Sequence, residues 1–186
     1  MKRLLLGALC VAGLVQMASA ATIPAKAIVA QLLLDRAFDQ SLATHRATKP
    51  WPWADMAAVA RLTVPRLGTT RIILGAGSGQ AMAFGPTLLA GGAAIGAPGT
   101  TVLAAHRDTH FAFLKDIRPG DRFGVQGIDG TTRQYRVNGT EVVRFNAFTV
   151  AADRSGHHLA LTTCYPFGAM TQGPLRFVVR ADQVAA

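Results

Sequence analysis

Short runs of apolar and β-branched residues, separated by turns, dominate the chain from residue 57 onward. The clearest runs cover residues 100–105, 158–163 and 174–180. They indicate β-strands, because branched and aromatic side chains fit a pleated, half-buried surface. Looser runs cover 59–64, 71–74, 121–128, 131–137 and 140–145. Seven or eight short strands at even spacing, with few helices, predict a mostly β domain that is either a barrel or a sandwich.

Glycine-containing turns separate several of these runs. Asp129-Gly130 supplies the positive φ angles that a tight hairpin needs. Asn138-Gly139 repeats the signal, so we expect a second turn there. The glycine-rich stretch 75–79 also follows a strand run, but no Gly-Lys-Ser/Thr comes after it. We therefore expect a flexible loop at 75–79 rather than a phosphate-binding loop.

One longer segment, residues 25–48, has apolar residues at helical spacing instead: Ile28, Leu32, Leu33, Ala37, Phe38 and Leu42. This stripe predicts a helix, and Pro24 suits its first turn. Two interpretations remain open: a stalk or clasp that holds the domain near a membrane, or a helix packed on the domain. A short helical turn is also expected over 109–117.

The first 21 residues have the pattern of a secretory signal or a membrane anchor. Lys2 and Arg3 precede the apolar stretch 4–15, and Ala18-Ser19-Ala20 matches a small-x-small cleavage site. A cleaved signal and a retained anchor both fit this pattern. Either one leaves the rest of the chain outside the cytoplasm.

Two prolines, Pro50 and Pro52, end the helical segment because they impose an extended path. Trp51 and Trp53 alternate with them, and we expect these rings to dock the linker on the domain rather than to lie at a membrane interface. The chain then divides into a signal or anchor over 1–21, a helix and linker over 22–56, and the β-domain over 57–186.

The chain is basic, with a net charge of +9; without Lys2 and Arg3, 17 basic and 10 acidic residues leave +7. Such a charge favours anionic neighbours, for example membrane headgroups, although a solubilising surface explains it equally well. We expect no nucleic-acid partner, because the basic residues are scattered along the chain.

Beyond the first 21 residues Cys164 is the only cysteine, so its thiol cannot form an internal disulfide. It ends a strand run, because Pro166 has no N–H to continue a ladder. A strand end is held by the scaffold yet open to a substrate. We therefore favour a functional thiol over a buried, inert one. The other cysteine, Cys10, is not expected to carry a lipid, because Leu9 stands where a small residue would be required.

A histidine and an arginine have comparable positions: His106 ends the run 100–105, and Arg176 lies in the run 174–180. With Cys164 they suggest nucleophilic acyl transfer. The thiolate would attack a carbonyl, the imidazole would move a proton, and the guanidinium would stabilise the oxyanion.

A metal site is not expected. His106 and His110 are four residues apart, but no glutamate lies between them and no third ligand is nearby in the sequence. We see no acidic cluster suited to calcium either, so we expect neither a metal nor another cofactor.

Three sequence features together resemble the sortase family: Ala104-Ala105-His106-Arg107-Asp108, then Leu161-Thr162-Thr163-Cys164, then Arg176. The resemblance covers residues 57–182, and the motifs Pro50-Trp51-Pro52-Trp53 and Thr163-Cys164-Tyr165-Pro166-Phe167 further resemble the sortases of Gram-negative bacteria. It implies an eight-stranded barrel with His106, Cys164 and Arg176 around one groove. It also implies cleavage of an LPxTG-like sorting signal after its threonine, through a thioacyl enzyme that an amine resolves. Substrate contacts are expected from Ala105 and Thr163.

Two positions depart from the common family pattern: Ala160 stands where threonine is usual, and Ala105 where glycine is frequent. Neither carries the chemistry, so only the substrate preference is affected. Two alternatives remain. One is an exported cysteine peptidase or amidase with water as acceptor, and the other is a non-catalytic β-domain that binds a partner. The expected partners are a protein with a sorting signal, an amine acceptor and, through the N-terminus, the inner membrane. We expect a monomer whose domain faces the periplasm.

Overall fold

The computed structural model describes residues 13, 16, 26–75, 79–149, 155–171 and 173–185. After a helix at 26–44, the strands are β1 (Ala58–Val64), β2 (Thr69–Leu74), β3 (Thr87–Leu88), β4 (Gly99–Ala104), β5 (Arg122–Gly127), β6 (Thr132–Arg144), β7 (His157–Tyr165) and β8 (Leu175–Val184). Three short 3-10 helices lie between strands: η1 (Pro65–Leu67), η2 (Gly79–Ala83) and η3 (Ala112–Asp116).

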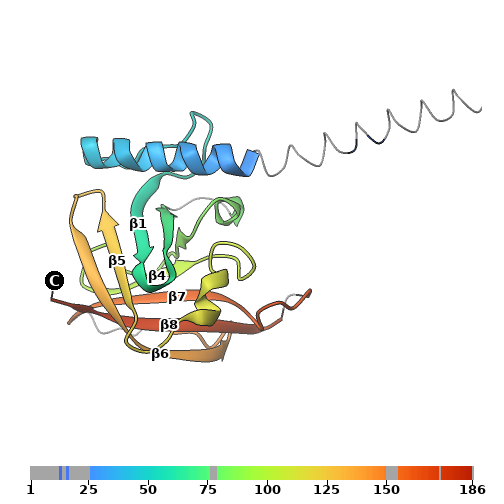
Figure 1. Cartoon of the computed structure of the whole chain (residues 1–186). Helices are drawn as coiled ribbons and strands as arrows, with labels where there is room; N and C mark the ends of the chain where they lie inside the picture. Colours follow the sequence, from blue (N-terminus) through green and yellow to red (C-terminus); the bar gives the residue numbers. More distant parts are fainter. Residues whose placement is uncertain are drawn as a thin grey trace, which may run out of the picture.

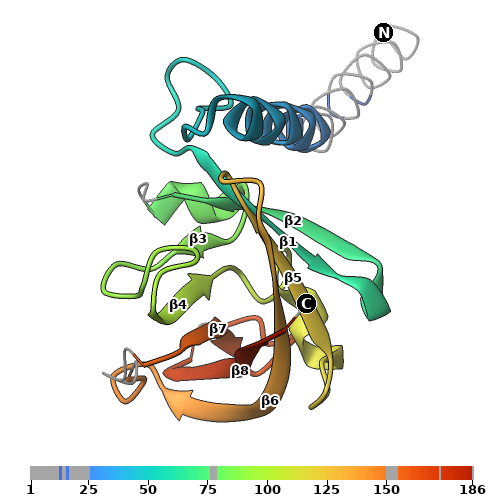
Figure 2. The same ribbon diagram turned by 90° about the vertical axis from the view of Figure 1, so that its left-hand side faces the viewer.

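The eight strands close into one barrel in the order β1-β2-β3-β4-β7-β8-β6-β5 (Figures 1 and 2). The prediction of a mostly β, eight-stranded barrel is confirmed, and the sandwich alternative is wrong. Most neighbours are antiparallel, but β4 runs parallel to β7 and β2 parallel to β3. Because β4 and β7 run in the same direction, their carboxyl ends reach the same edge of the sheet.

Alternating burial explains why these segments form strands around a common interior. In β1 every second side chain is buried, including Ala60, Leu62 and Val64. These residues share one core cluster with Phe123 of β5 and Leu161 of β7. The period of two matches the pleat of a strand, so one face of each strand fills the barrel.

The helix lies across one side of the barrel, over β1 and β2 (Figures 1 and 2). Its Leu34 and Phe38 form a second core cluster with Ala58, Ile72 and Leu74. Phe38 is fully buried, and burying a side chain of this kind stabilises the fold by about 1.5–3 kcal/mol. The interpretation of a helix packed on the domain is therefore confirmed. Within the described residues, no helix has the length and apolarity needed to cross a bilayer.

The helix ends earlier than residue 48, where its apolar stripe suggested. His45 adopts a φ of 53°, a left-handed conformation that stops the helical hydrogen bonding after residue 44. The Ser41 hydroxyl lies 2.8 Å from the Ala37 carbonyl and 3.0 Å from the Ala58 carbonyl, and it accepts the Thr48 N–H at 2.9 Å. One buried hydroxyl thus connects the end of the helix to the start of β1.

The two tryptophans of the linker have different environments. Trp51 packs edge-on against Phe84, with 5.3 Å between ring centroids, as the docking prediction requires. Trp53 is 83% exposed, so the docking prediction is wrong for this ring.

The two predicted turns also have different outcomes. Gly130 has a φ of 78° between β5 and β6, so the hairpin at Asp129-Gly130 is confirmed. The turn expected at Asn138-Gly139 is wrong, because β6 continues through both residues along β8. A register shift between Val137 and Gly139 absorbs the irregularity as a bulge. Of the loop expected at 75–79, residues 76–78 lie outside the described part of the chain.

Candidate active site

The ladder between β7 and β8 brings two of the predicted site residues together. Cys164 lies directly opposite Arg176 in this antiparallel pair. Leu161 and Val179 belong to the interior cluster. By strand alternation the side chains of Cys164 and Arg176 therefore both lie on the outer face of the barrel. Directly opposed residues have Cβ atoms about 4.5–5.5 Å apart, so the sulfur and the guanidinium share one surface.

His106 reaches the same surface through the parallel ladder between β4 and β7. The pairing runs without a shift from Gly99↔His157 to Ala104↔Thr162. The Thr163 hydroxyl continues it by donating to the Ala105 carbonyl at 2.7 Å. Continuation of this register by one more residue, beyond the end of the ladder at Ala104, leads to His106 beside Cys164. Ala105 belongs to the interior cluster, whereas His106 is exposed, so the imidazole lies on the outside of the barrel.

The three side chains are accessible. His106 is exposed, and Cys164 and Arg176 are half-buried. Cys164 is a free cysteine, so a substrate carbonyl can approach the sulfur from outside the barrel. This exposure disfavours the alternative in which Cys164 is buried and inert.

The backbone before β8 orients the guanidinium of Arg176. Its Nη1 donates to the Gly173 carbonyl at 3.0 Å and to the Leu175 carbonyl at 2.9 Å. Its Cζ lies 5.8 Å from the ring centroid of Phe145, just beyond the end of β6, which is within the range of a cation–π contact. Sequence reasoning missed Phe145, because only the β6–β8 pairing brings it to the site.

Ala105 and Thr163, from which we expected substrate contacts, are both buried. Their mutual hydrogen bond joins the residue before His106 to the residue before Cys164. Their side-chain environment therefore favours a positioning role. Contact with a substrate stays a prediction.

Arg107 is a further functional candidate that the sequence analysis did not single out. It is only 6% exposed. Its Nη2 donates to the Ala169 carbonyl and, at 3.0 Å, to the Thr171 carbonyl, while Nε lies 3.3 Å from the Asp108 carboxylate. A buried cation requires such partners. Arg107 thus connects the residue after His106 to the loop between Cys164 and Arg176; its place directly after the histidine is the only sequence signal.

Aromatic rings pack against one another at the two ends of the same loop. Phe167 lies edge-on to Phe177 at 5.3 Å and to Tyr165 at 6.1 Å between centroids. Tyr165 in turn stacks on Phe177 at 6.2 Å. These three rings flank Cys164 and Arg176 in sequence, so they hold the ends of β7 and β8 in their mutual register.

His110 has a separate role from His106. Its Nε2 lies 3.2 Å from the Ala83 carbonyl. Burial lowers the pKa of His110, and the nearby Arg71 and His106 lower it further, although the Ala83 contact partly compensates. Among the residues that the structure describes, no three His, Cys, Asp or Glu side chains are grouped to hold a metal ion.

Comparison with known proteins agrees with this geometry. The sortase domain family matches residues 62–184. Sortase A from Corynebacterium diphtheriae has a similar fold, with a TM-score of 0.65 and 23% identity over 72% of this chain and 64% of that chain. The pilus-related sortase C of group B Streptococcus gives a TM-score of 0.59 and 26% identity over 69% of this chain and 68% of that chain.

Sortase C of Streptococcus pneumoniae gives a TM-score of 0.61 and 24% identity, over 68% of this chain and 66% of that chain. The chain therefore spans 64% of the Corynebacterium structure and about two thirds of the two streptococcal ones. No match was found among curated proteins. The family match covers well over half of the 186 residues and includes His106, Cys164 and Arg176. The chain belongs to the sortase family.

Proposed function

We propose that this protein is a cysteine transpeptidase that cleaves an LPxTG-like C-terminal sorting signal and transfers the protein to an amine. The observation that carries the proposal is the register of three adjacent strands. Cys164 lies opposite Arg176 in the β7–β8 pair. The register of β4 against β7, continued past Ala104 and Ala105, leads to His106 beside Cys164. A nucleophile, a proton carrier and a fixed cation thus share one accessible surface.

In the first step the Cys164 thiolate attacks the carbonyl of the signal's threonine. The carbonyl electrons move to oxygen, where the guanidinium of Arg176 stabilises the negative charge. The tetrahedral intermediate then collapses, the C–N bond breaks, and His106 gives its proton to the leaving amine. The products are a thioester on Cys164 and a free C-terminal fragment.

In the second step an amine attacks the thioester carbonyl. A new C–N bond forms, the C–S bond breaks, and the thiolate of Cys164 is restored. The proton lost by the amine goes to the neutral imidazole of His106. His106 is thereby protonated again, as it was at the start of the first step. Water in place of the amine would give hydrolysis with the same residues, which is the alternative enzyme function.

We further propose that the protein is held at the inner membrane of a Gram-negative bacterium, with its domain in the periplasm and as a monomer. The N-terminal pattern of Lys2, Arg3 and the apolar stretch 4–15 supports export. Ile28, Leu32 and Trp53 are exposed by 63%, 57% and 83%, which suits a membrane interface at this end of the molecule. The Gram-negative assignment depends on the Thr163-Cys164-Tyr165-Pro166-Phe167 motif.

The experiment that tests the proposed chemistry is the intact mass of the full chain, in detergent, after mixing with a peptide that carries an LPxTG-like signal. We expect a thioacyl adduct whose mass includes the peptide up to its threonine, and no adduct on Cys164→Ala. Added amine should convert the adduct to an amide. If a folded protein with a readily labelled thiol forms no adduct with any of a panel of such signals, the transpeptidase proposal is wrong. Cleavage that an added amine never diverts would favour the hydrolase.

A further inference from the structure

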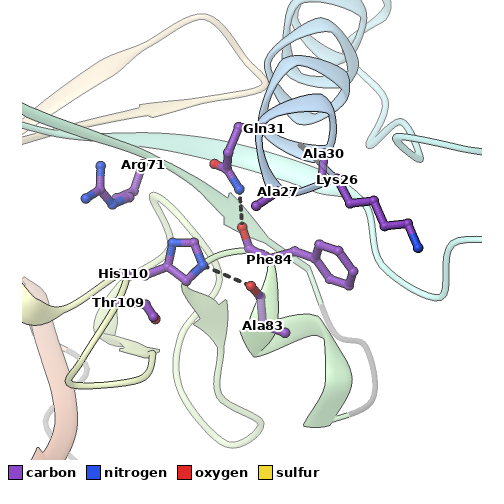
Figure 3. A pocket seen from close by; sticks show the side chains of 9 residues that line it. All are labelled: Lys26, Ala27, Ala30, Gln31, Arg71, Ala83, Phe84, Thr109 and His110. Carbon is purple, nitrogen blue, oxygen red and sulfur yellow. Dashed lines mark hydrogen bonds between the residues drawn. The ribbon is translucent and has the colours of Figure 1, made fainter. Parts of the chain in front are cut away.

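A cleft of about 680 Å³ lies between the N-terminal helix, β2, η2 and the segment after His106 (Figure 3). Its polar lining residues come from three of these elements: Lys26, Gln31, Arg71, Thr109 and His110. Gln31 Nε2 donates to the Phe84 carbonyl at 2.9 Å, so the helix wall is tied to the segment after η2. The cleft is therefore a built feature of the domain.

The guanidinium of Arg71 gives this cleft its charge. Arg71 is half-buried, and its Nη1 donates to the Thr70 carbonyl at 2.7 Å. Its Nε is buried and has no hydrogen-bond partner in the structure. Burial also lowers the pKa of Arg71. A buried cationic donor without a partner is costly, and an anion is the ligand that would satisfy it.

The other charged and titratable groups around the cleft point to the same ligand class. Lys26 of the helix also lines the cleft, but its ammonium points away from Arg71 (Figure 3). His110 adds a group that can become a cation. Among the described lining residues none is acidic, so nothing there already neutralises Arg71. The contact of His110 Nε2 with the Ala83 carbonyl requires a proton on Nε2, because a carbonyl only accepts. Proton uptake would therefore occur at Nδ1.

Anion binding and protonation of His110 are consequently coupled. Arg71 and His106 lower the pKa of His110 by repulsion. An anion beside Arg71 offsets this repulsion and so raises the pKa of His110. When His110 takes up a proton, the anion has two cationic neighbours, Arg71 and His110. The anion should thus bind more tightly as the pH falls through the pKa of His110.

The remaining lining favours an organic carboxylate over inorganic phosphate. Ala27, Ala30 and Phe84 line the cleft with apolar surface, which suits a carbon skeleton. With His110 neutral, Arg71 is the only fixed cation that comes from the barrel, and it matches a monoanion.

The position of the cleft relates this carboxylate to the acyl transfer. Phe111 N–H donates to the His106 carbonyl at 3.1 Å, so His110 lies one turn from His106. We infer that the cleft binds the carboxylate of the amine acceptor, because Thr109 and His110 of its lining belong to the segment that directly follows His106, the residue proposed to take the amine's proton. The assignment depends on the proposed transpeptidation. The amine nitrogen forms the new C–N bond, the thioester C–S bond breaks, and the amine's proton passes to His106.

The first test reads the site without catalysis. The imidazole resonances of His110 are followed by NMR in full-chain Cys164→Ala while sodium acetate, and separately inorganic phosphate, is added. We expect saturable binding of acetate that raises the pKa of His110, and at least about tenfold weaker binding after Arg71→Gln, because hydrogen bonds between the guanidinium and the carboxylate are lost. Arg36→Gln, an exposed change of equal charge on the N-terminal helix that lines the cleft, should bind like the parent. No saturable shift, or tighter binding of phosphate than of acetate, would overturn the inference.

The second test compares alanine with alaninamide as acceptors for the thioacyl enzyme. Because the two amines differ in basicity, the quantity of interest is how the ratio of their aminolysis rates changes between proteins. We expect the preference for alanine to fall about tenfold in Arg71→Gln and to stay unchanged in Arg36→Gln. His110→Gln, which can still donate to the Ala83 carbonyl, should remove the rise of this preference as the pH falls below 6.5, since the pKa of His110 is lowered from that value by burial.

The two tests separate the possible failures. If no thioacyl enzyme forms, the proposed function is wrong, whereas the acetate titration still reports on the cleft. If acetate binds but Arg71→Gln leaves the acceptor ratio unchanged, the cleft is an anion site and its assignment to the acceptor is wrong.

Discussion

The two sides of the barrel are organised on different principles. On the face under the helix, Phe38, Leu34 and Leu74 are fully buried and hold two elements together by packing. At the ends of β4, β7 and β8, half-buried or exposed polar side chains are placed by ladder register instead. The comparison teaches that stability and chemistry are separable here: the helix face determines how firmly the domain holds together, and the strand edge determines which groups meet.

The largest expected effect on stability comes from the helix face. Phe38→Ala should lower the free energy of unfolding by about 3–5 kcal/mol, because a fully buried ring leaves a cavity. Denaturant unfolding measures this loss, and Leu32→Ala, at an exposed position of the same helix, is the matched control. The rate of thioacylation per folded molecule should not change. A large fall in that rate would show that the helix also shapes the active site.

At the ends of β7 and β8 we expect the reverse: a large effect on the reaction rate and a small effect on stability. Arg176→Lys should slow thioacylation by about two to three orders of magnitude, since a point ammonium cannot reproduce the planar donors of a guanidinium. Unfolding should be nearly unaffected. Arg180→Lys, four residues along β8 and paired with Glu141, serves as control. Near-normal turnover in Arg176→Lys would remove Arg176 from the oxyanion role.

Intermediate effects on stability and on the thioacylation rate are expected at the buried hydrogen bond between β7 and the segment after β4. Thr163→Val removes the donor to the buried Ala105 carbonyl, which should cost about 1–3 kcal/mol of stability and also slow thioacylation by displacing Cys164 from His106. The neighbouring Thr162 is the matched control, because its buried hydroxyl has no hydrogen-bond partner in the structure. Thr162→Val should be neutral or stabilising. Equal effects of the two changes would contradict a positioning role for Thr163.

The smallest effect concerns the pH dependence of folding. Hydrogen bonds from Arg66 hold the pKa of Asp121 below its usual value of 3.8. A depressed pKa in the folded state stabilises the protein above the unfolded value, and this stabilisation is lost as the pH falls below 3.8 and through the folded value. Asp121→Asn should therefore flatten the loss of stability in this acid range, measured by unfolding at stepped pH. Asp116→Asn, an exposed change nearby, should leave the slope as it is.

Much of the fold could be predicted from the sequence, and so could the positions of Cys164 and Arg176 near strand ends, because apolar runs meet Pro166 or a polar motif there. Whether Cys164 and Arg176 are directly opposite depends on register, which only the folded sheet shows. Arg107 and Phe145 were missed for a related reason. Arg107 contacts the loop before β8, and Phe145 contacts Arg176. No local sequence pattern predicts such contacts.

The errors have a similar origin. Asn138-Gly139 has the composition of a turn, but the long pairing of β6 with β8 overrides that local preference. The helix ends at residue 44 rather than at residue 48, because His45 is left-handed and the Thr48 N–H donates to the Ser41 hydroxyl instead of a helical carbonyl. Local propensity thus identified most strands to within a residue or two, and it failed where tertiary pairing decides.

The parallel pairing of β4 with β7 has a consequence for the newly made chain. It joins residues 58 positions apart, whereas the β5–β6 hairpin joins near neighbours. Distant pairings carry a larger loop-closure entropy and form late. Until that closure, Cys164 is an ordinary thiol without its imidazole, so we expect reactivity toward a sorting signal to arise only when the barrel is complete. The strand order thus prevents an unfinished chain from reacting with sorting signals during biosynthesis.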